Sequence, residues 1–205
     1  MYLNRKDLFT FIYQQNLWLS NESKSGFGSE LKQTEKVIEF INYFMKNYNI
    51  STIADLACGD FNWQQYFDFS LIEKYYGIDI VSNLIDENNK KFAQEKIEFL
   101  NLDILDDSLP KVDLILCRDC LVHYSFAEID LIIKNIIASK PKYFITTSFQ
   151  NLKVNSDIIT GKWRPLNFDL QPFNFPKPLL VFLEGCTEFN GLFKDKSLCV
   201  WSLNY

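Results

Sequence analysis

Short apolar runs alternate with stretches of helical periodicity through the middle of the chain. The apolar runs are rich in β-branched and aromatic residues, which is typical of strands covered on both faces, and they predict strands at 50–56, 75–80, 97–102, 112–117 and 143–149. Apolar positions repeating every three to four residues predict helices at 2–19, 30–48, 83–94 and 126–138. Strands that alternate with helices indicate an α/β, Rossmann-like doubly wound fold with a mostly parallel sheet.

The two ends of the chain depart from this alternation. The helical N-terminal extension, residues 1–48, is interrupted by a polar loop at 18–30 that is rich in serine and glycine. Residues 150–178 contain four prolines and many aromatic residues and predict a long loop without regular structure. Two further strands are expected at 179–184 and 198–203.

Composition and charge narrow the class of protein. A chain of 205 residues with 47% hydrophobic residues predicts one folded domain, 1–205, with a sizeable core. A net charge of −5 argues against a nucleic-acid partner. No apolar stretch is long enough for membrane insertion, and no signal peptide is recognised, so a cytoplasmic location is expected.

Five cysteines at irregular spacing imply no disulfide framework. The pair Cys117 and Cys120 has no second pair with which to bind zinc, and buried cysteine is a common small apolar filler. The sequence therefore predicts no metal site.

A strand that breaks into a glycine turn forms the first candidate ligand site. Gly59 follows the strand that ends at Leu56 and permits a tight turn, with free backbone N–H groups at the carboxyl edge of the sheet. Asp79 comes 20 residues later, at the tip of the second strand, and its carboxylate suits the two hydroxyls of a ribose. A nicotinamide fingerprint needs three glycines, and acids flank Gly59 instead. The site thus favours a cationic ligand with an amine, a sulfonium and a ribose.

Four motifs in order carry a family resemblance: Asp55-Leu-Ala-Cys-Gly-Asp60, Gly77-Ile-Asp79, Leu102-Asp103-Ile104 and the run from Asp113 to His123. Over residues 48–149 the chain resembles class I methyltransferases that use S-adenosylmethionine (SAM). The resemblance implies a seven-stranded sheet with an antiparallel last strand. It also implies a SAM-binding core at 49–149 and two last strands at 179–205. Residues 150–178 depart from the family plan and are interpreted from their composition as an acceptor-side loop. The resemblance further implies cofactor contacts from Asp55, Ala57, Cys58, Gly59, Asp79, Ile80, Asp103, Ile104 and Arg118, with Asp103 on the adenine amine.

The end of the fourth strand is the candidate catalytic position. Six nearly apolar residues are followed by three ionisable ones, Arg118, Asp119 and His123. His123 is the only histidine in the chain. A histidine has its ordinary pKa near neutrality, so His123 suits the role of a base for a hydroxyl acceptor. Two other interpretations stay open: a structural His123, and an Arg118–Asp119 salt pair.

Two polar segments are candidates for the acceptor side. The loop at 18–30 fits a lid over the cofactor, with Trp18 and Ser25 among its contacts, and also fits a plain connector. The 150–178 loop fits an acceptor pocket wall that offers charge, stacking and amide groups, or else a loop packed on the sheet edge. Its candidate contacts are Lys162, Trp163, Arg164 and Asn167.

The acceptor is expected to be a small molecule that is methylated on oxygen. The Asn/Asp-Pro-Pro-Tyr motif of many amino-group methylases is absent. The serine-rich loop and the Gly-Lys-Trp-Arg-Pro-Leu-Asn segment resemble a bacterial group associated with surface-polysaccharide modification, such as O-methylation of a sugar or phosphoramidate. A methylase of protein or RNA, and a silent SAM-binding partner subunit, are the alternatives. The sequence does not specify the oligomeric state.

Overall fold

Seven strands form one mixed sheet in the computed structural model, which describes residues 3–203. The strand order is β3-β2-β1-β4-β5-β7-β6. β1 to β5 pair in parallel, whereas β7 runs antiparallel to both β5 and β6. The strands are β1 (Thr52–Leu56), β2 (Lys74–Asp79), β3 (Ile97–Asn101), β4 (Leu114–Cys117), β5 (Tyr143–Phe149), β6 (Leu180–Leu183) and β7 (Lys196–Ser202). The predicted sheet with its antiparallel last strand is confirmed.

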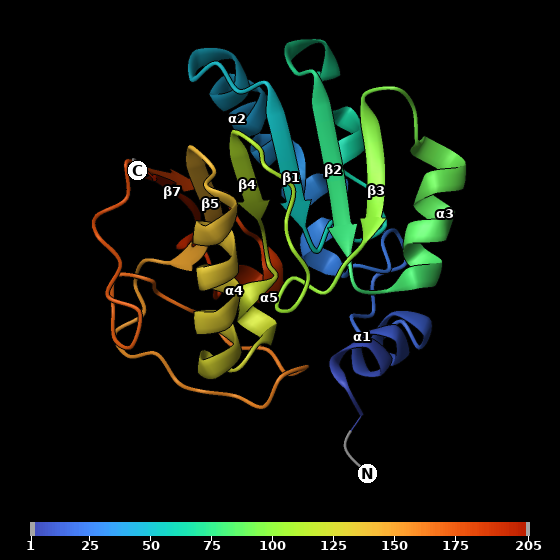
Figure 1. The fold of residues 1–205 in the computed structure, drawn as a ribbon. Helices are drawn as coiled ribbons and strands as arrows, with labels where there is room; N and C mark the ends of the chain where they lie inside the picture. Colours follow the sequence, from blue (N-terminus) through green and yellow to red (C-terminus); the bar gives the residue numbers. More distant parts are fainter. Residues whose placement is uncertain (1–2, 204–205) are drawn as a thin grey trace.

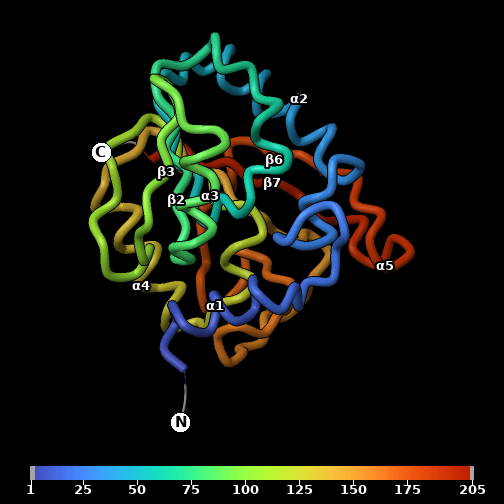
Figure 2. Tube along the Cα trace, turned by 90° about the vertical axis from the view of Figure 1, so that its right-hand side faces the viewer, coloured from blue at the N-terminus to red at the C-terminus, as the bar shows by residue number. Residues whose placement is uncertain are grey.

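Helices cover the sheet and one of its edges. They are α1 (Arg5–Gln14), α2 (Leu31–Asn47), α3 (Ser82–Phe92), α4 (Phe126–Ser139) and the short α5 (Glu188–Gly191). Single 3-10 turns lie at η1 (Phe27–Ser29), η2 (Gln64–Tyr66), η3 (Phe69–Leu71) and η4 (Leu121–His123). In Figures 1 and 2, α2 and α4 lie on opposite faces of the sheet, and α1 lies below the carboxyl ends of the parallel strands. The extension is therefore placed over the edge where open α/β sheets bind ligands.

The helix starts show how the extension is tied to the core. α2 begins at Leu31, and the Leu31 N–H donates to Glu22 Oε1 at 2.7 Å. The side chain of Glu22, from the preceding loop, thus satisfies one of the free N–H groups at the start of α2. The first predicted helix ends at Gln14 instead of Leu19, and its predicted start at Tyr2 lies outside the described residues.

Burial follows the apolar runs closely. All four residues of β4 are fully buried, as expected for a central strand covered on both faces. Residues 150–178 contain no helix or strand, as predicted, and they are ordered by hydrogen bonds instead. Among residues 3–203, no helix is long and apolar enough to cross a membrane.

Candidate functional site

A cavity of about 430 Å³ lies along the carboxyl edge of the sheet. Many of its lining residues fall into two groups. The first, the glycine end, lies at the tips of β1, β2 and β3 and consists of Ala57, Gly59, Asp79, Ile80, Leu102 and Ile104. The second, the aromatic end, lies at β4, β5 and β7 and consists of Trp18, Arg118, Asp119, His123, Phe149, Trp163, Glu188, Phe189, Phe193 and Lys196.

The glycine turn lies against the loop at 18–30 and lines the cavity. Ala57 and Gly59 both have a positive φ, 58° and 59°, so the chain leaves β1 in a left-handed turn. A Cβ on Gly59 would lie 2.1 Å from Ser25 Oγ, so any side chain there would collide with the loop above. Both residues line the cavity as predicted. Cys58 between them is buried and outside the lining, with its N–H on Ile78 O at 3.0 Å.

Asp79 closes the other side of this turn. Its carboxylate accepts the Gly59 N–H at 3.3 Å and the Val81 N–H at 3.0 Å. Burial raises the pKa of Asp79 to about 6. The backbone hydrogen bonds act in the opposite direction but are outweighed. A carboxylate has about four acceptor positions, so acceptor capacity remains for a hydroxyl donor of a ligand. Asp79 and Ile80 both line the cavity, and their contact with the cofactor stays a prediction.

Asp55 has a different position from the one that the resemblance implied. It is buried and outside the cavity lining, and its Oδ2 accepts from Tyr75 Oη at 2.7 Å and from Gln64 Nε2 at 2.8 Å. Gln64 Nε2 also donates to the Cys58 carbonyl at 2.7 Å. Burial raises the pKa of Asp55 to about 6. Asp55 thus positions the glycine turn through Gln64 and does not reach a ligand.

Asp103, like Asp55, binds another side chain of the protein and lies outside the cavity lining. Its Oδ2 accepts from Arg5 Nε at 3.0 Å, and Arg5 further pairs with Asp106 and, at 3.6 Å, with Glu128. Asp103 does not line the cavity, whereas Ile104 does. Arg5 therefore fastens α1 to the loop after β3 and to α4, and the predicted contact of Asp103 with adenine has no support from its position.

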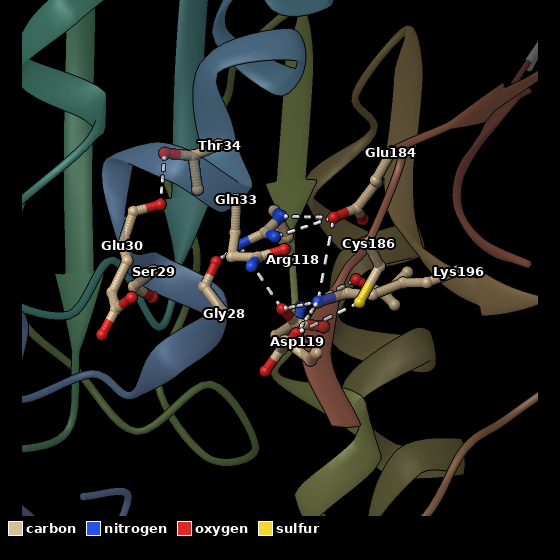
Figure 3. A network of polar contacts seen from close by, with 12 residues as sticks. Gly28, Ser29, Glu30, Gln33, Thr34, Arg118, Asp119, Glu184, Cys186 and Lys196 are labelled. Carbon is tan, nitrogen blue, oxygen red and sulfur yellow. Dashed lines mark hydrogen bonds and ion pairs between the residues drawn. The ribbon is translucent and has the colours of Figure 1, made fainter. Parts of the chain in front are cut away.

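A buried network of charges lies at the aromatic end (Figure 3). Arg118 donates to Glu184 Oε2 at 2.7 and 3.1 Å and to the Gly28 carbonyl at 2.9 Å. Lys196 Nζ donates to Asp119 and lies 3.5 Å from Glu188 and 3.8 Å from Glu184. Lys196 and Arg118 together hold the pKa of Asp119 at about 2, although burial opposes this. The expected Arg118–Asp119 pair exists, at 3.4 Å, as one contact of a larger cluster.

His123 ends this network on the cavity side. Its Nδ1 lies 3.0 Å from the Lys162 carbonyl oxygen. A carbonyl oxygen only accepts, so the proton of the neutral ring belongs on Nδ1, and Nε2 is left as the acceptor. Burial lowers the pKa of His123 below its usual value, which keeps the ring neutral at physiological pH. The ring is therefore in the form that a general base needs.

The loop at 18–30 is docked on the glycine turn. Asp60 accepts from Ser23 Oγ at 2.8 Å and from the Lys24 N–H at 2.8 Å, while its own N–H donates to Ser25 Oγ at 3.0 Å. The Trp18 ring lies 5.4 Å from the His123 ring. Trp18 and Ser25 both line the cavity, so the loop reaches both groups of lining residues.

Of the four residues in the 150–178 loop that were predicted to contact the acceptor, one lines the cavity and three do not. Trp163 lines the cavity, and its ring lies 6.0 Å from Phe149 and 4.9 Å from Phe193. Arg164 is buried and donates to the carbonyls of Ser156, Leu121 and Tyr124. Asn167 is likewise buried in hydrogen bonds within the loop, and the exposed Lys162 side chain lies outside the lining.

Arg164 is therefore a structural anchor and not a ligand for phosphate or carboxylate. Its three carbonyl contacts, with the Gly161 N–H on His123 O at 2.8 Å, fix the loop against η4. This fixation places Trp163 in the cavity wall.

Sequence reasoning missed the residues that the C-terminal third brings to the cavity. Lys196 begins β7, and Glu188, Phe189 and Phe193 precede it in the connection from β6. Their positions depend on β7 pairing with β5 across more than 40 residues of chain, with Phe149 opposite Lys196. Lys196 is only 4% exposed, which is unusual for a lysine, but this burial is visible in the structure and not in the sequence.

Comparisons with known proteins bear on this geometry. Residues 54–137 match the family model of a methyltransferase domain. This segment runs from β1 to α4 and includes the glycine end, Arg118, Asp119 and His123. The match confirms the predicted cofactor, SAM, at the level of the domain. The comparison with curated proteins found no match.

Solved structures show the fold. Human N-acetylserotonin methyltransferase, solved with SAM, has a TM-score of 0.67 at 13% identity; the match covers 99% of this chain and 61% of that one. Magnesium protoporphyrin IX methyltransferase from Synechocystis PCC 6803 has a TM-score of 0.65 at 12% identity, covering 97% of each chain. The methyltransferase domain of bacterial CtHen1 has a TM-score of 0.64 at 12% identity, covering 86% of this chain and 100% of that one. The chain spans about three fifths of the human enzyme.

Proposed function

We propose that the protein transfers the methyl group of SAM to an oxygen atom of a small molecule. The observation that carries this proposal is the position of a neutral histidine in one cavity with the glycine turn and Asp79. The domain match supports methyl transfer, and the cavity chemistry supports oxygen as the acceptor atom.

The residues of the glycine end fit the cofactor. Asp79 keeps acceptor capacity for ribose hydroxyls, and Gly59 lines the cavity beside it. Leu102 and Ile104 offer an apolar surface for a base. When bound, SAM supplies a sulfonium-activated methyl group.

The chain's own contribution is alignment and removal of a proton. The docked loop and α1 cover the carboxyl edge, which restricts water and fixes the geometry of an in-line displacement. Nε2 of His123 takes the proton of the acceptor hydroxyl as the oxygen attacks. Asp119 is fixed by Lys196 and Arg118 and favours the positive charge that His123 then carries.

The sugar or phosphoramidate acceptor implied by the resemblance remains a prediction. Arg164, the residue expected to bind a phosphate, is occupied by three backbone carbonyls. Methylation of a protein or RNA has less support, because the cavity is lined by a docked loop and by aromatic side chains rather than by a basic rim. The silent partner subunit is disfavoured by the remaining acceptor capacity of Asp79 and by the neutral base.

A pair of isosteric probes tests oxygen as the acceptor atom. The protein is incubated with SAM and either p-ethylphenol or p-ethylaniline, and the formation of S-adenosylhomocysteine (SAH) is followed. We expect turnover with the phenol that rises with pH as His123 loses its proton. Turnover with the aniline alone would mean that nitrogen is the acceptor and would overturn the proposal.

A further inference from the structure

The mouth of the cavity carries exposed apolar side chains that the transfer of a methyl group does not itself require. Leu19 and Phe189 are each 69% exposed, and both line the cavity. Leu17, Phe27 and Trp163 line it as well and are also exposed. Large apolar side chains that gather around one opening indicate that an apolar body covers them in a complex.

The inner wall of the aromatic end continues this surface. The Phe193 ring lies 5.6 Å from Phe149, 4.9 Å from Trp163 and 5.7 Å from Phe189, so the four rings form one connected face. The three contacts of Phe193 are edge-on, with interplanar angles of 78°, 63° and 88°, so the face has a fixed shape. A flat or extended apolar group fits against it better than a polyol, whose hydroxyls would lose water without gaining partners.

The charges behind this wall do not provide an anion site. Among the described residues that line the cavity, Arg118 and Lys196 are the cations. Arg118 is bound by Glu184 and by the Gly28 carbonyl, and Lys196 by Asp119 and Glu188. Three carboxylates thus face two cations, which leaves a net negative charge. A phosphate or carboxylate in the acceptor would be repelled here.

We propose that the methyl acceptor is an uncharged hydroxyl compound with an extended apolar body, a lipophilic phenol or alcohol. The hydroxyl enters towards His123, the apolar body lies on the Phe149–Trp163–Phe193 wall, and its outer part is covered by Leu19 and Phe189. This inference rests on the proposed function, and it replaces a phosphate-bearing acceptor by a neutral, lipophilic one.

The test uses the protein loaded with SAH and measures calorimetric binding of two phenols of similar length, p-butylphenol and p-hydroxyphenylpropanoate. We expect p-butylphenol to bind at least tenfold more tightly. Across p-ethyl-, p-propyl- and p-butylphenol the affinity should rise about fourfold per methylene, which is what burial of a methylene predicts.

Matched variants locate the binding site. Leu19→Ser and Phe189→Ser remove apolar surface from the rim and should weaken p-butylphenol about fivefold to tenfold each, with SAH affinity unchanged. Leu192→Ser is the control, because Leu192 is 70% exposed on the same segment as Phe189 but does not line the cavity.

The outcomes separate this inference from the proposed function. Equal or tighter binding of the carboxylate probe, no binding of any neutral phenol to the SAH-loaded protein, or an equal effect of Leu192→Ser would overturn the lipophilic acceptor and leave methyl transfer standing. Failure of SAH itself to bind would remove the methyltransferase proposal instead.

Discussion

The two ends of the cavity are built in different ways. The glycine end comes mainly from β1, β2 and the connection between them, and backbone groups form its key contacts: Asp79 accepts two N–H groups, and Gly59 is packed against Ser25. The aromatic end comes from five segments of the chain, and side chains form its contacts. The glycine end is thus set by local chain geometry, whereas the aromatic end depends on the packing of distant segments.

The largest effect is expected at His123. His123→Gln removes the base and should lower the rate of methyl transfer to p-ethylphenol by about 10²- to 10⁴-fold, while SAH affinity stays unchanged. The rate of the wild-type protein should fall as the pH drops through the lowered pKa of His123, since the protonated ring takes no proton. Steady-state kinetics across pH measures both effects.

Lys162→Ala is the matched control for His123, because the backbone carbonyl that holds Nδ1 remains. Full activity of His123→Gln would assign the ring a structural role and leave the aromatic end without a base.

The buried charge network gives the second prediction. Lys196→Met removes the cation shared by Asp119, Glu184 and Glu188 and should lower the free energy of unfolding by about 3–5 kcal/mol, because buried carboxylates lose their partner. Urea denaturation measures the change. Lys142→Met is the control: Lys142 pairs with Asp113 at the surface, and its loss should change stability far less. Equal effects of the two variants would show that the network is not a stabilising unit.

How much of each end could be predicted follows from the same contrast. The strand that ends at Leu56, the turn at Gly59 and Asp79 lie within 30 residues of sequence, so pattern and spacing were enough to place them. Asp55 and Asp103 belong to the same set of motifs. The Asp55 carboxylate, however, accepts from Tyr75 and Gln64, and the Asp103 carboxylate accepts from Arg5. Spacing placed these acids near the edge but did not reveal which groups they contact.

The aromatic end shows why the rest was out of reach. Lys162, Trp163 and Arg164 are consecutive, yet only Trp163 lines the cavity, because Arg164 turns inward to three carbonyls. No repeat or spacing in a loop without regular structure states which side chain faces which way. Lys196 and Phe193 reach the cavity only through the antiparallel pairing of β7 with β5.

The third prediction concerns pH and sharpens the role of the glycine end. In the proposed binding mode, ribose hydroxyls donate to the ionised form of Asp79, whose pKa burial raises to about 6. SAH affinity should therefore be constant above pH 7 and fall below pH 6, by at most about tenfold per pH unit. Calorimetry at several pH values measures this.

Two variants assign the pH effect. Asp79→Asn should bind SAH more weakly and show no such dependence, while His123→Gln should keep it. A fall with the same midpoint in Asp79→Asn would assign the effect to another group.

The smallest effect on ligand binding is expected for the ion pairs of Arg5 that hold α1 in place. Arg5→Gln frees Asp103, Asp106 and Glu128 and should speed SAH dissociation by about threefold to fivefold, because a half-exposed ion-pair cluster contributes about 1 kcal/mol or less. Stopped-flow fluorescence of Trp18 and Trp163 reports dissociation. Lys134→Gln, which breaks an exposed pair with Asp130 on α4, is the control. An unchanged rate in Arg5→Gln would show that α1 is not a barrier to exit.

One titration tests the central claim that the glycine end binds SAM through Asp79. SAM, SAH and NAD are titrated calorimetrically into the wild-type protein and into Asp79→Asn at pH 7.5. The structure predicts binding of SAM and SAH but not of NAD to the wild-type protein, and a loss of about tenfold or more in the variant. Equal affinity of both proteins for SAH, or binding of NAD alone, would contradict the account.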